Sequence, residues 1–236
     1  MSRPAARRFA STVVSAVLVA IATGAVPAGA VDTTTPGAPQ GNVTPTLQPA
    51  TGVALVAQSA PVDGRVALLL HNGTARAVRI DLVTAVATSA EGGLATRART
   101  VKTYPQVLGP DQLALTSVTF RTKGLATTPT VTAKVRSTPV SATRAEQVLS
   151  VGGLVLSAPQ TGTVAQTMRS TLTNATSSWT ARRPEAAVMC FGEAGTPTTF
   201  SAAPASAGRV APGKTVSASV PLTSLCPTYL VAARAS

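Results

Sequence analysis

Cys190 and Cys226 are the two cysteines of the sequence, and their chemistry depends on the compartment in which the chain resides. In a secreted chain an even number of cysteines favours a disulfide, because oxidising compartments preserve such bridges. A Cys190–Cys226 bridge would add roughly 3–4 kcal/mol to stability on the chain-entropy estimate. The alternative is a pair of buried free thiols. No metal site is expected, because zinc takes about four ligands and the sequence has one histidine, His71.

His71 is the side chain best suited to act as a general base near neutral pH. No G-x-S-x-G elbow accompanies it, and a lone histidine needs partners to act. The residue 102 positions later is Thr173, so the histidine is not shared by the internal repeat described below. We therefore predict that His71 is a surface residue at the end of a strand, without a catalytic role.

The acidic residues of the first half are too dispersed to indicate a glycosidase, which needs two carboxylates close together. Asp63 precedes Gly64 and Asp111 follows Pro110, so both are predicted to lie in turns. Asp81 belongs to a predicted strand in which apolar and polar residues alternate. A phosphate-binding loop and a dinucleotide fingerprint are also missing from the sequence. The prediction is a protein that is not an enzyme and uses no cofactor.

Basic residues are concentrated in the first half. Residues 51–144 carry eleven Lys/Arg against four Asp/Glu, a net charge of +7, whereas residues 145–236 carry six against three, a net charge of +3. Alternation along a strand would place such residues on one face, which could attract anionic envelope polymers or lipid headgroups. The alternative is a soluble surface that is basic by chance. The predicted face consists of Arg97, Arg99, Lys102, Arg121, Lys123, Lys134 and Arg136.

An internal repeat with an offset of 102 residues organises the chain. Leu70-His-Asn-Gly-Thr74 corresponds to Leu172-Thr-Asn-Ala-Thr176, and Leu108-Gly-Pro-Asp111 corresponds to Val210-Ala-Pro-Gly213. A period of this length indicates a duplicated domain, because solenoid repeats are much shorter.

Short apolar segments that alternate with polar residues, separated by Gly, Pro and Asn turns, predict strands. With no sustained helical period the pattern favours an all-β fold of two tandem immunoglobulin-like β-sandwich domains. One helical turn is possible at Ala145–Leu149. The expected strands are residues 52–58, 65–71, 77–88, 113–120, 130–136, 153–157, 166–172, 186–191, 216–222 and 229–233.

The turn residues of both repeats resemble those of bacterial FxLYD-type immunoglobulin-like modules, which occur on exported proteins. The resemblance rests on an Asn-x-Thr turn, an apolar strand, a Gly hairpin and a Pro-Gly/Asp turn. In the second repeat these features include Asn174, Thr176, Gly195 and Pro212. The Phe-x-Leu-Tyr-Asp signature itself is missing from both repeats. The resemblance implies a non-catalytic module.

The N-terminus predicts a signal peptide over residues 1–30. Three arginines precede an uncharged apolar run from Phe9 to Val26, and Ala28-Gly29-Ala30 supplies small residues for cleavage. Retention as a membrane anchor is the alternative; no span is expected after cleavage. Loss of the three arginines leaves seventeen Lys/Arg against eight Asp/Glu, a net charge of +9. The excess of arginine over lysine and the high alanine content indicate a GC-rich bacterial genome.

The predicted organisation continues with a flexible leader (31–50), a first β-sandwich domain (51–138), a linker (139–147) and a second β-sandwich domain (148–236). The favoured function is an exported, non-catalytic binding or spacer protein at the cell envelope, whose basic first domain contacts an anionic polymer. Nucleic acid is not an expected partner, since the protein is expected to be exported and no aromatic residues are interleaved with the charge. A structural or assembly partner of other exported proteins, acting through an open sheet edge, and an enzyme of unrecognised type remain alternatives.

Overall fold

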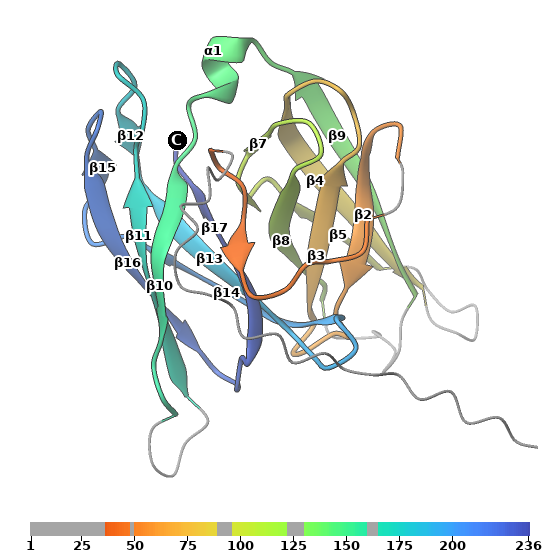
Figure 1. Ribbon diagram of the computed structural model, residues 1–236. Coiled ribbons are helices and arrows are strands. Elements are labelled where there is room, and N and C mark those ends of the chain that lie inside the picture. Colours follow the sequence, from red (N-terminus) through yellow and green to blue (C-terminus); the bar gives the residue numbers. More distant parts are fainter. Residues whose placement is uncertain (1–35, 48–49, 89–95, 122–129, 160–164) are drawn as a thin grey trace, which may run out of the picture. The chain divides into compact units, whose positions relative to one another are not determined.

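The computed structural model describes residues 36–47, 50–88, 96–121, 130–159 and 165–236 (Figure 1). These residues form an all-β fold in which every paired strand is antiparallel to its neighbours, as the alternating pattern predicted. The predicted signal peptide (1–30) lies outside the described residues. Within them there is no helix long and apolar enough to cross a membrane.

The first repeat, residues 51–138, contributes two sheets that enclose a buried aliphatic core. In that core Leu68 and Leu70 of one sheet pack against Ile80 and Val83 of the other, because alternate side chains of each strand point inward. One sheet has the order β2 (Val53–Gln58), β3 (Arg65–Asn72), β8 (Leu113–Thr119), β6 (Thr103–Tyr104). The other has the order β5 (Thr96–Thr100), β4 (Val78–Thr88), β7 (Val107–Leu108), and β9 (Thr130–Pro139) also pairs with β4.

The second repeat, residues 148–236, forms its own core, which includes Met168, Leu172, Val188 and Val231. One sheet has the order β10 (Ser150–Leu156), β11 (Gln166–Thr173), β16 (Thr215–Leu222). Another has the order β1 (Gln40–Gly41), β17 (Thr228–Arg234), β13 (Glu185–Phe191), β14 (Pro197–Pro204). A two-stranded sheet pairs β12 (Ala181–Arg182) with β15 (Arg209–Val210).

The sequence repeat is also a repeat of strand register. In the first repeat Leu70 of β3 lies opposite Ala114 of β8, and 102 residues later Leu172 of β11 lies opposite Val216 of β16. The edge strands β2 and β10 both carry a register shift where they pair with β3 and β11. The same pairing pattern therefore occurs twice in the chain.

A buried asparagine, Asn72 or Asn174, holds the same turn in each repeat by side-chain hydrogen bonds. The side-chain Nδ2 of Asn72 donates to the carbonyls of Arg76 (2.9 Å) and Gly109 (2.8 Å), while its Oδ1 accepts from the amide and hydroxyl of Thr74. Neither Asn72 nor Gly73 has the positive φ that such residues often adopt in tight turns. Side-chain hydrogen bonds shape the turn instead.

A third apolar core joins the two repeats, and it explains why β3 and β13 read as continuous apolar runs. Residues Val66 to Asn72 are all buried, as are Ala186 to Phe191, so these strands are covered on both faces. Burial of each large side chain in this core contributes about 1.5–3 kcal/mol. Its buried members are Ala67, Leu69, Tyr104, Leu115, Ala187, Met189, Phe191, Leu230 and Ala232.

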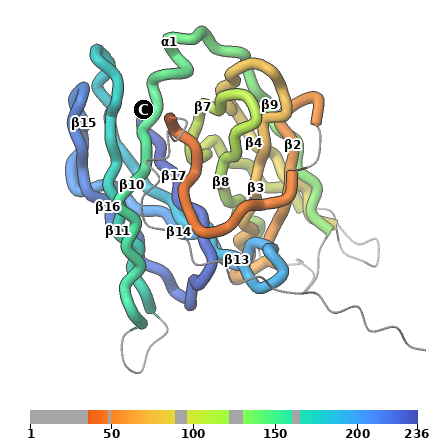
Figure 2. The backbone as a smooth tube through the Cα atoms, viewed as in Figure 1, coloured from red at the N-terminus to blue at the C-terminus, as the bar shows by residue number. Residues whose placement is uncertain are grey.

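Several segments differ from the sequence-based expectation. Part of the predicted flexible leader is ordered, because Gln40–Gly41 pairs with β17, where the tube in Figure 2 brings the two segments together. The helical turn expected at Ala145–Leu149 begins earlier, as α1 (Ala142–Ala145), because the Ser141 side chain caps its first turn. Strand β14 was not predicted, and neither were the two-residue strands β6, β7, β12 and β15.

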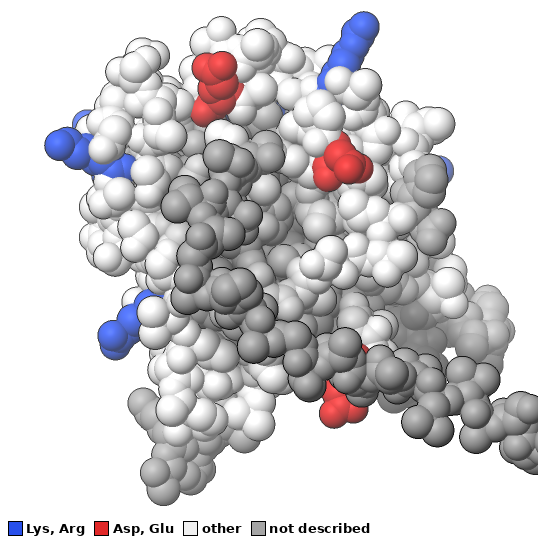
Figure 3. Space-filling view, in the orientation of Figure 1, with Lys and Arg blue, Asp and Glu red and all other residues white. Residues whose placement is uncertain are grey.

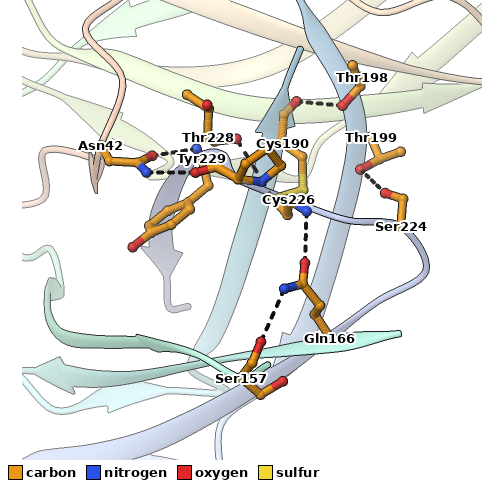
Figure 4. Close-up of a disulfide and its surroundings, with 11 residues drawn as sticks. Asn42, Ser157, Gln166, Cys190, Thr198, Thr199, Ser224, Cys226, Thr228 and Tyr229 are labelled. Carbon is orange, nitrogen blue, oxygen red and sulfur yellow. Dashed lines mark hydrogen bonds between the residues drawn. A yellow bond between two sulfur atoms is a disulfide. The ribbon is translucent and has the colours of Figure 1, made fainter. Parts of the chain in front are cut away.

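The predicted disulfide is confirmed: Cys190 and Cys226 are bonded at 2.01 Å (Figure 4). It ties β13 to the segment between β16 and β17. The buried amide of Cys226 donates to Oε1 of Gln166 at 2.8 Å, so the bridge is also joined to β11. The bond connects residues 36 positions apart and constrains the unfolded chain accordingly.

Candidate functional site

The outer face of β5, β4 and β9 carries a groove lined by cations, which we call the basic groove. Arg97 and Arg99 are exposed on β5, and Lys134 is exposed on β9. In the sheet register Thr84 of β4 lies opposite both Arg99 and Lys134, so the central strand separates the two sides. A hollow of about 370 Å³ is lined by Thr84, Val86, Arg97, Arg99, Thr132 and Lys134.

The strand geometry sets the spacing of these charges. Strands β5 and β9 flank β4, so their backbones lie about 10 Å apart across the groove. Along β5, Arg97 and Arg99 are two residues apart, which corresponds to about 7 Å. Lys134 and Arg136 repeat this spacing on β9. Alternation therefore makes two cationic rows, with a floor of Thr84 and Val86 between them.

Arg136 lies on the exposed side of β9 at the end of the groove next to an acid. Asp81 accepts hydrogen bonds from the hydroxyl of Thr138 (2.6 Å) and from Nε of Arg79 (2.8 Å). The Thr138 hydrogen bond, together with Arg79 and the charge of Arg136, lowers the pKa of Asp81 against a smaller effect of burial. An ionised Asp81 thus offsets part of the positive charge at this end.

Lys102 and Arg121, two further members of the predicted face, are not brought into this groove. Lys102 forms an ion pair with Glu185 of the second repeat, with Nζ 3.3 Å from Oε1. Arg121 is exposed beyond the end of β8, next to Phe120, whose amide donates to the carbonyl of Gly64. Lys123 lies outside the described residues. The groove therefore contains Arg97, Arg99 and Lys134, with Arg136 on the same face.

Lys102 belongs to a polar cluster at the contact between the repeats that was not predicted. The hydroxyl of Tyr104 donates to Oε2 of Glu185 at 2.5 Å, and the guanidinium of Arg234 lies 5.7 Å from the centroid of the Tyr104 ring. Burial and the hydrogen bond to the carboxylate raise the pKa of Tyr104. Burial also raises the pKa of Glu185, but hydrogen bonds from Tyr104 and Lys102 and the nearby cations bring it below its usual value.

His71 is not a surface residue, so that prediction is wrong. It is 3% exposed, because it lies on the same side of β3 as Ala67 and Leu69, which the second repeat covers. Its Nε2 is 2.7 Å from Oδ1 of Asp111, a turn residue with φ of 61°. In the part of the chain that the structure describes, no hydroxyl or thiol hydrogen-bonds to His71, so the pair has no adjacent nucleophile.

Cations elsewhere on the described surface are more dispersed. Figure 3 shows one face on which Lys and Arg side chains stand singly among uncharged residues. Arg169, Arg209 and Lys214 of the second repeat are exposed, each on a different segment, and Arg209 lies opposite Arg182 in the β12–β15 pair. They provide a matched set of three cations outside the basic groove.

No protein-family model matches this chain, and no curated protein is significantly similar to it in sequence. Across residues 36–47, 50–88, 96–121, 130–159 and 165–236, no group of three or more His, Cys, Asp or Glu side chains is placed to hold a metal ion. The functional argument therefore depends on the geometry and charge of the described surfaces.

Proposed function

We propose that this chain is an exported, non-catalytic binding protein of the bacterial cell envelope that holds an anionic polymer in the basic groove. The observation that carries the proposal is the hollow between β5 and β9, where Arg97 and Arg99 face Lys134 across the central strand. These three cations form no ion pair among the described residues, so their charge is available to a ligand.

The shape of the groove favours a linear polyanion over a lipid surface. Two rows of cations about 10 Å apart, repeating along each strand at about 7 Å, can follow phosphate or carboxylate groups on an extended chain. A membrane surface would be engaged more strongly by a flat basic face with apolar side chains that enter the lipid. The floor of this groove instead consists of Thr84 and Val86, beside Thr132 of β9. A soluble polyanion is therefore the ligand that fits best.

The division of the chain into two immunoglobulin-like domains is part of the same proposal. Each repeat has a sandwich core of its own and the same pairing pattern, which supports two tandem immunoglobulin-like domains of the kind the FxLYD resemblance implies. The third core, which joins the repeats, would hold the groove in a fixed orientation. A rigid pair of domains suits a binding or spacer module.

Export is supported by two independent features. The N-terminal residues have the pattern of a cleaved signal peptide. The Cys190–Cys226 disulfide is compatible with an oxidising compartment outside the cytoplasm. The excess of arginine over lysine supports a bacterial source. Extracellular or envelope-bound location is therefore part of the proposed function.

The test compares two triple variants of the secreted chain that have the same net charge. Arg97→Gln, Arg99→Gln and Lys134→Gln together remove the cations of the groove. Arg169→Gln, Arg209→Gln and Lys214→Gln remove three exposed cations elsewhere. Affinity for linear polyphosphate is measured by calorimetry at low salt, with anionic phospholipid vesicles as a second probe.

The groove variant is expected to bind polyphosphate roughly a hundredfold more weakly than the wild type, taking about 1 kcal/mol for each lost cation. The control variant is expected to bind within a few-fold of the wild type. Equal weakening in both variants would mean that net charge, and not the groove, governs binding. Binding to vesicles but not to polyphosphate would replace the polymer with a lipid surface.

A further inference from the structure

We propose that a second site, beside Trp179 and away from the basic groove, binds a neutral saccharide. A pocket of about 240 Å³ lies between the link that follows the first repeat and the turn that follows β11. In Figure 1, α1 and this turn lie at the same end of the second repeat. The side chains that give the pocket its chemistry are Trp179, Thr143, Glu146, Gln147, Ser177 and Ser178.

These side chains match the two kinds of surface that a sugar presents. A tryptophan ring offers a broad, flat apolar face together with a polar N–H group, and a sugar ring has an apolar face of C–H groups. The hydroxyl groups of the sugar need hydrogen-bond donors and acceptors, which Gln147, Ser177 and Ser178 supply. A few convergent polar groups beside an aromatic wall are typical of small-ligand sites.

The charge of the pocket separates it from the basic groove. Glu146 is the one ionisable side chain among the lining residues, and the neighbouring Arg144 offsets its charge, so the pocket has no excess of cations to attract an anionic ligand. Nη1 of Arg144 donates to Oε1 of Gln147 at 2.6 Å, which fixes the amide. Nε2 of Gln147 makes no hydrogen bond to any described residue and can donate to a ligand hydroxyl.

Comparison of the two repeats indicates that Trp179 is not required by the turn itself. The carbonyl of Trp179 accepts from Nδ2 of Asn174 at 2.6 Å, and the corresponding carbonyl in the first repeat belongs to Arg76. Asn174 and Trp179 are five residues apart, whereas Asn72 and Arg76 are four apart. The second repeat therefore has one extra residue in this turn. The hydrogen bond from Asn174 uses only the backbone carbonyl of Trp179, so it does not require an aromatic side chain there.

Part of the Trp179 side chain packs against the core of the second repeat, which holds the ring in place. Because its backbone is held and its ring is packed, the Trp179 side chain loses little conformational entropy when a ligand stacks on the exposed part of the ring. Trp179 is also the single tryptophan of the sequence. Its fluorescence therefore reports on this pocket alone.

The experiment titrates the secreted chain with neutral tetrasaccharides and follows both Trp179 fluorescence and heat of binding. The probes are the β-1,4-linked N-acetylglucosamine tetramer and maltotetraose, with a trigalacturonate as the anionic comparison. Thr143→Arg fills the pocket from the exposed side of α1 without touching the core. Ala142→Arg, on the neighbouring exposed residue of the same helix, is the matched control.

At least one neutral tetrasaccharide is expected to give a saturable fluorescence change and heat, and trigalacturonate is expected to bind at least tenfold more weakly. Thr143→Arg is expected to abolish the signal, and Ala142→Arg to retain it. Glu146→Gln is expected to reduce the ratio of affinities for the neutral and the anionic sugar. Glu193→Gln, at an exposed hairpin, should leave this ratio unchanged. No heat from either neutral sugar at millimolar concentration, or equal binding by Thr143→Arg, would overturn the proposal.

Discussion

Asn174→Ala is predicted to destabilise the protein by about 4 kcal/mol, because the side chain has no exposure and makes four hydrogen bonds. Nδ2 donates to the carbonyls of Trp179 (2.6 Å) and Val210 (3.0 Å), and Oδ1 accepts from the amide (3.2 Å) and hydroxyl (2.7 Å) of Thr176. Each bond contributes about 1 kcal/mol, and unpaired buried partners add a desolvation penalty.

Asn42→Ala is the control for this substitution. Asn42 also makes two hydrogen bonds that join separate segments, to the carbonyl of Pro227 and from the amide of Tyr229, both at 2.8 Å. Because Asn42 is exposed, water can replace its side chain, and the expected loss is below about 1 kcal/mol.

Urea unfolding followed by circular dichroism and tryptophan fluorescence gives the free energy of unfolding of each variant. The expected order of stability is wild type, then Asn42→Ala, then Asn174→Ala by a wide margin. Asn72→Ala should resemble Asn174→Ala, since the same fastening occurs in both repeats. A loss of less than about 1 kcal/mol in Asn174→Ala would refute the argument that buried asparagines hold the two turns.

Two further predictions concern the disulfide and the polar cluster between the repeats. Reduction of Cys190–Cys226 is expected to lower the free energy of unfolding by about 3–4 kcal/mol, measured in urea with and without reductant, and an unchanged midpoint would contradict it. Glu185 has a folded-state pKa below its ordinary value of 4.5, so its ionised form stabilises the fold above that pH and the stability is lost as the pH falls through the folded pKa. Tyr104→Phe removes the hydrogen bond to Glu185 and should make stability less dependent on pH below 4.5 in acid-unfolding curves; an unaltered pH dependence would show that Tyr104 does not hold the carboxylate.

The strands were predictable where apolar and polar residues alternate along a segment, or where the segment is wholly apolar. Strand β4 shows the alternation in sequence, and β3 the continuous run that burial on both faces demands. Strand β14 was missed because Pro197 and Pro204 bound a segment in which Phe200 is the one large apolar residue and no clear period appears. Proline is tolerated there because β14 is an edge strand.

The basic groove was only partly predictable. Alternation alone places Arg97 with Arg99 and Lys134 with Arg136, but it does not reveal which strands are neighbours. The position of Lys102 depends on Glu185, 83 residues away, and no local pattern signals that contact. Burial of His71 was not predictable either, because its neighbours Ala67 and Leu69 on the same side of β3 belong to the core that joins the repeats.

The salt dependence of polyphosphate binding tests the central claim most directly. Each cation that releases a counterion contributes about 0.7 to the slope of log affinity against log salt for a single-stranded polyanion. Loss of Arg97, Arg99 and Lys134 should therefore reduce the magnitude of the slope by about 2 relative to wild type. The Arg169, Arg209 and Lys214 variant should keep the wild-type slope. Equal slopes for all three proteins, or no binding at low salt, would contradict a polyanion site between β5 and β9.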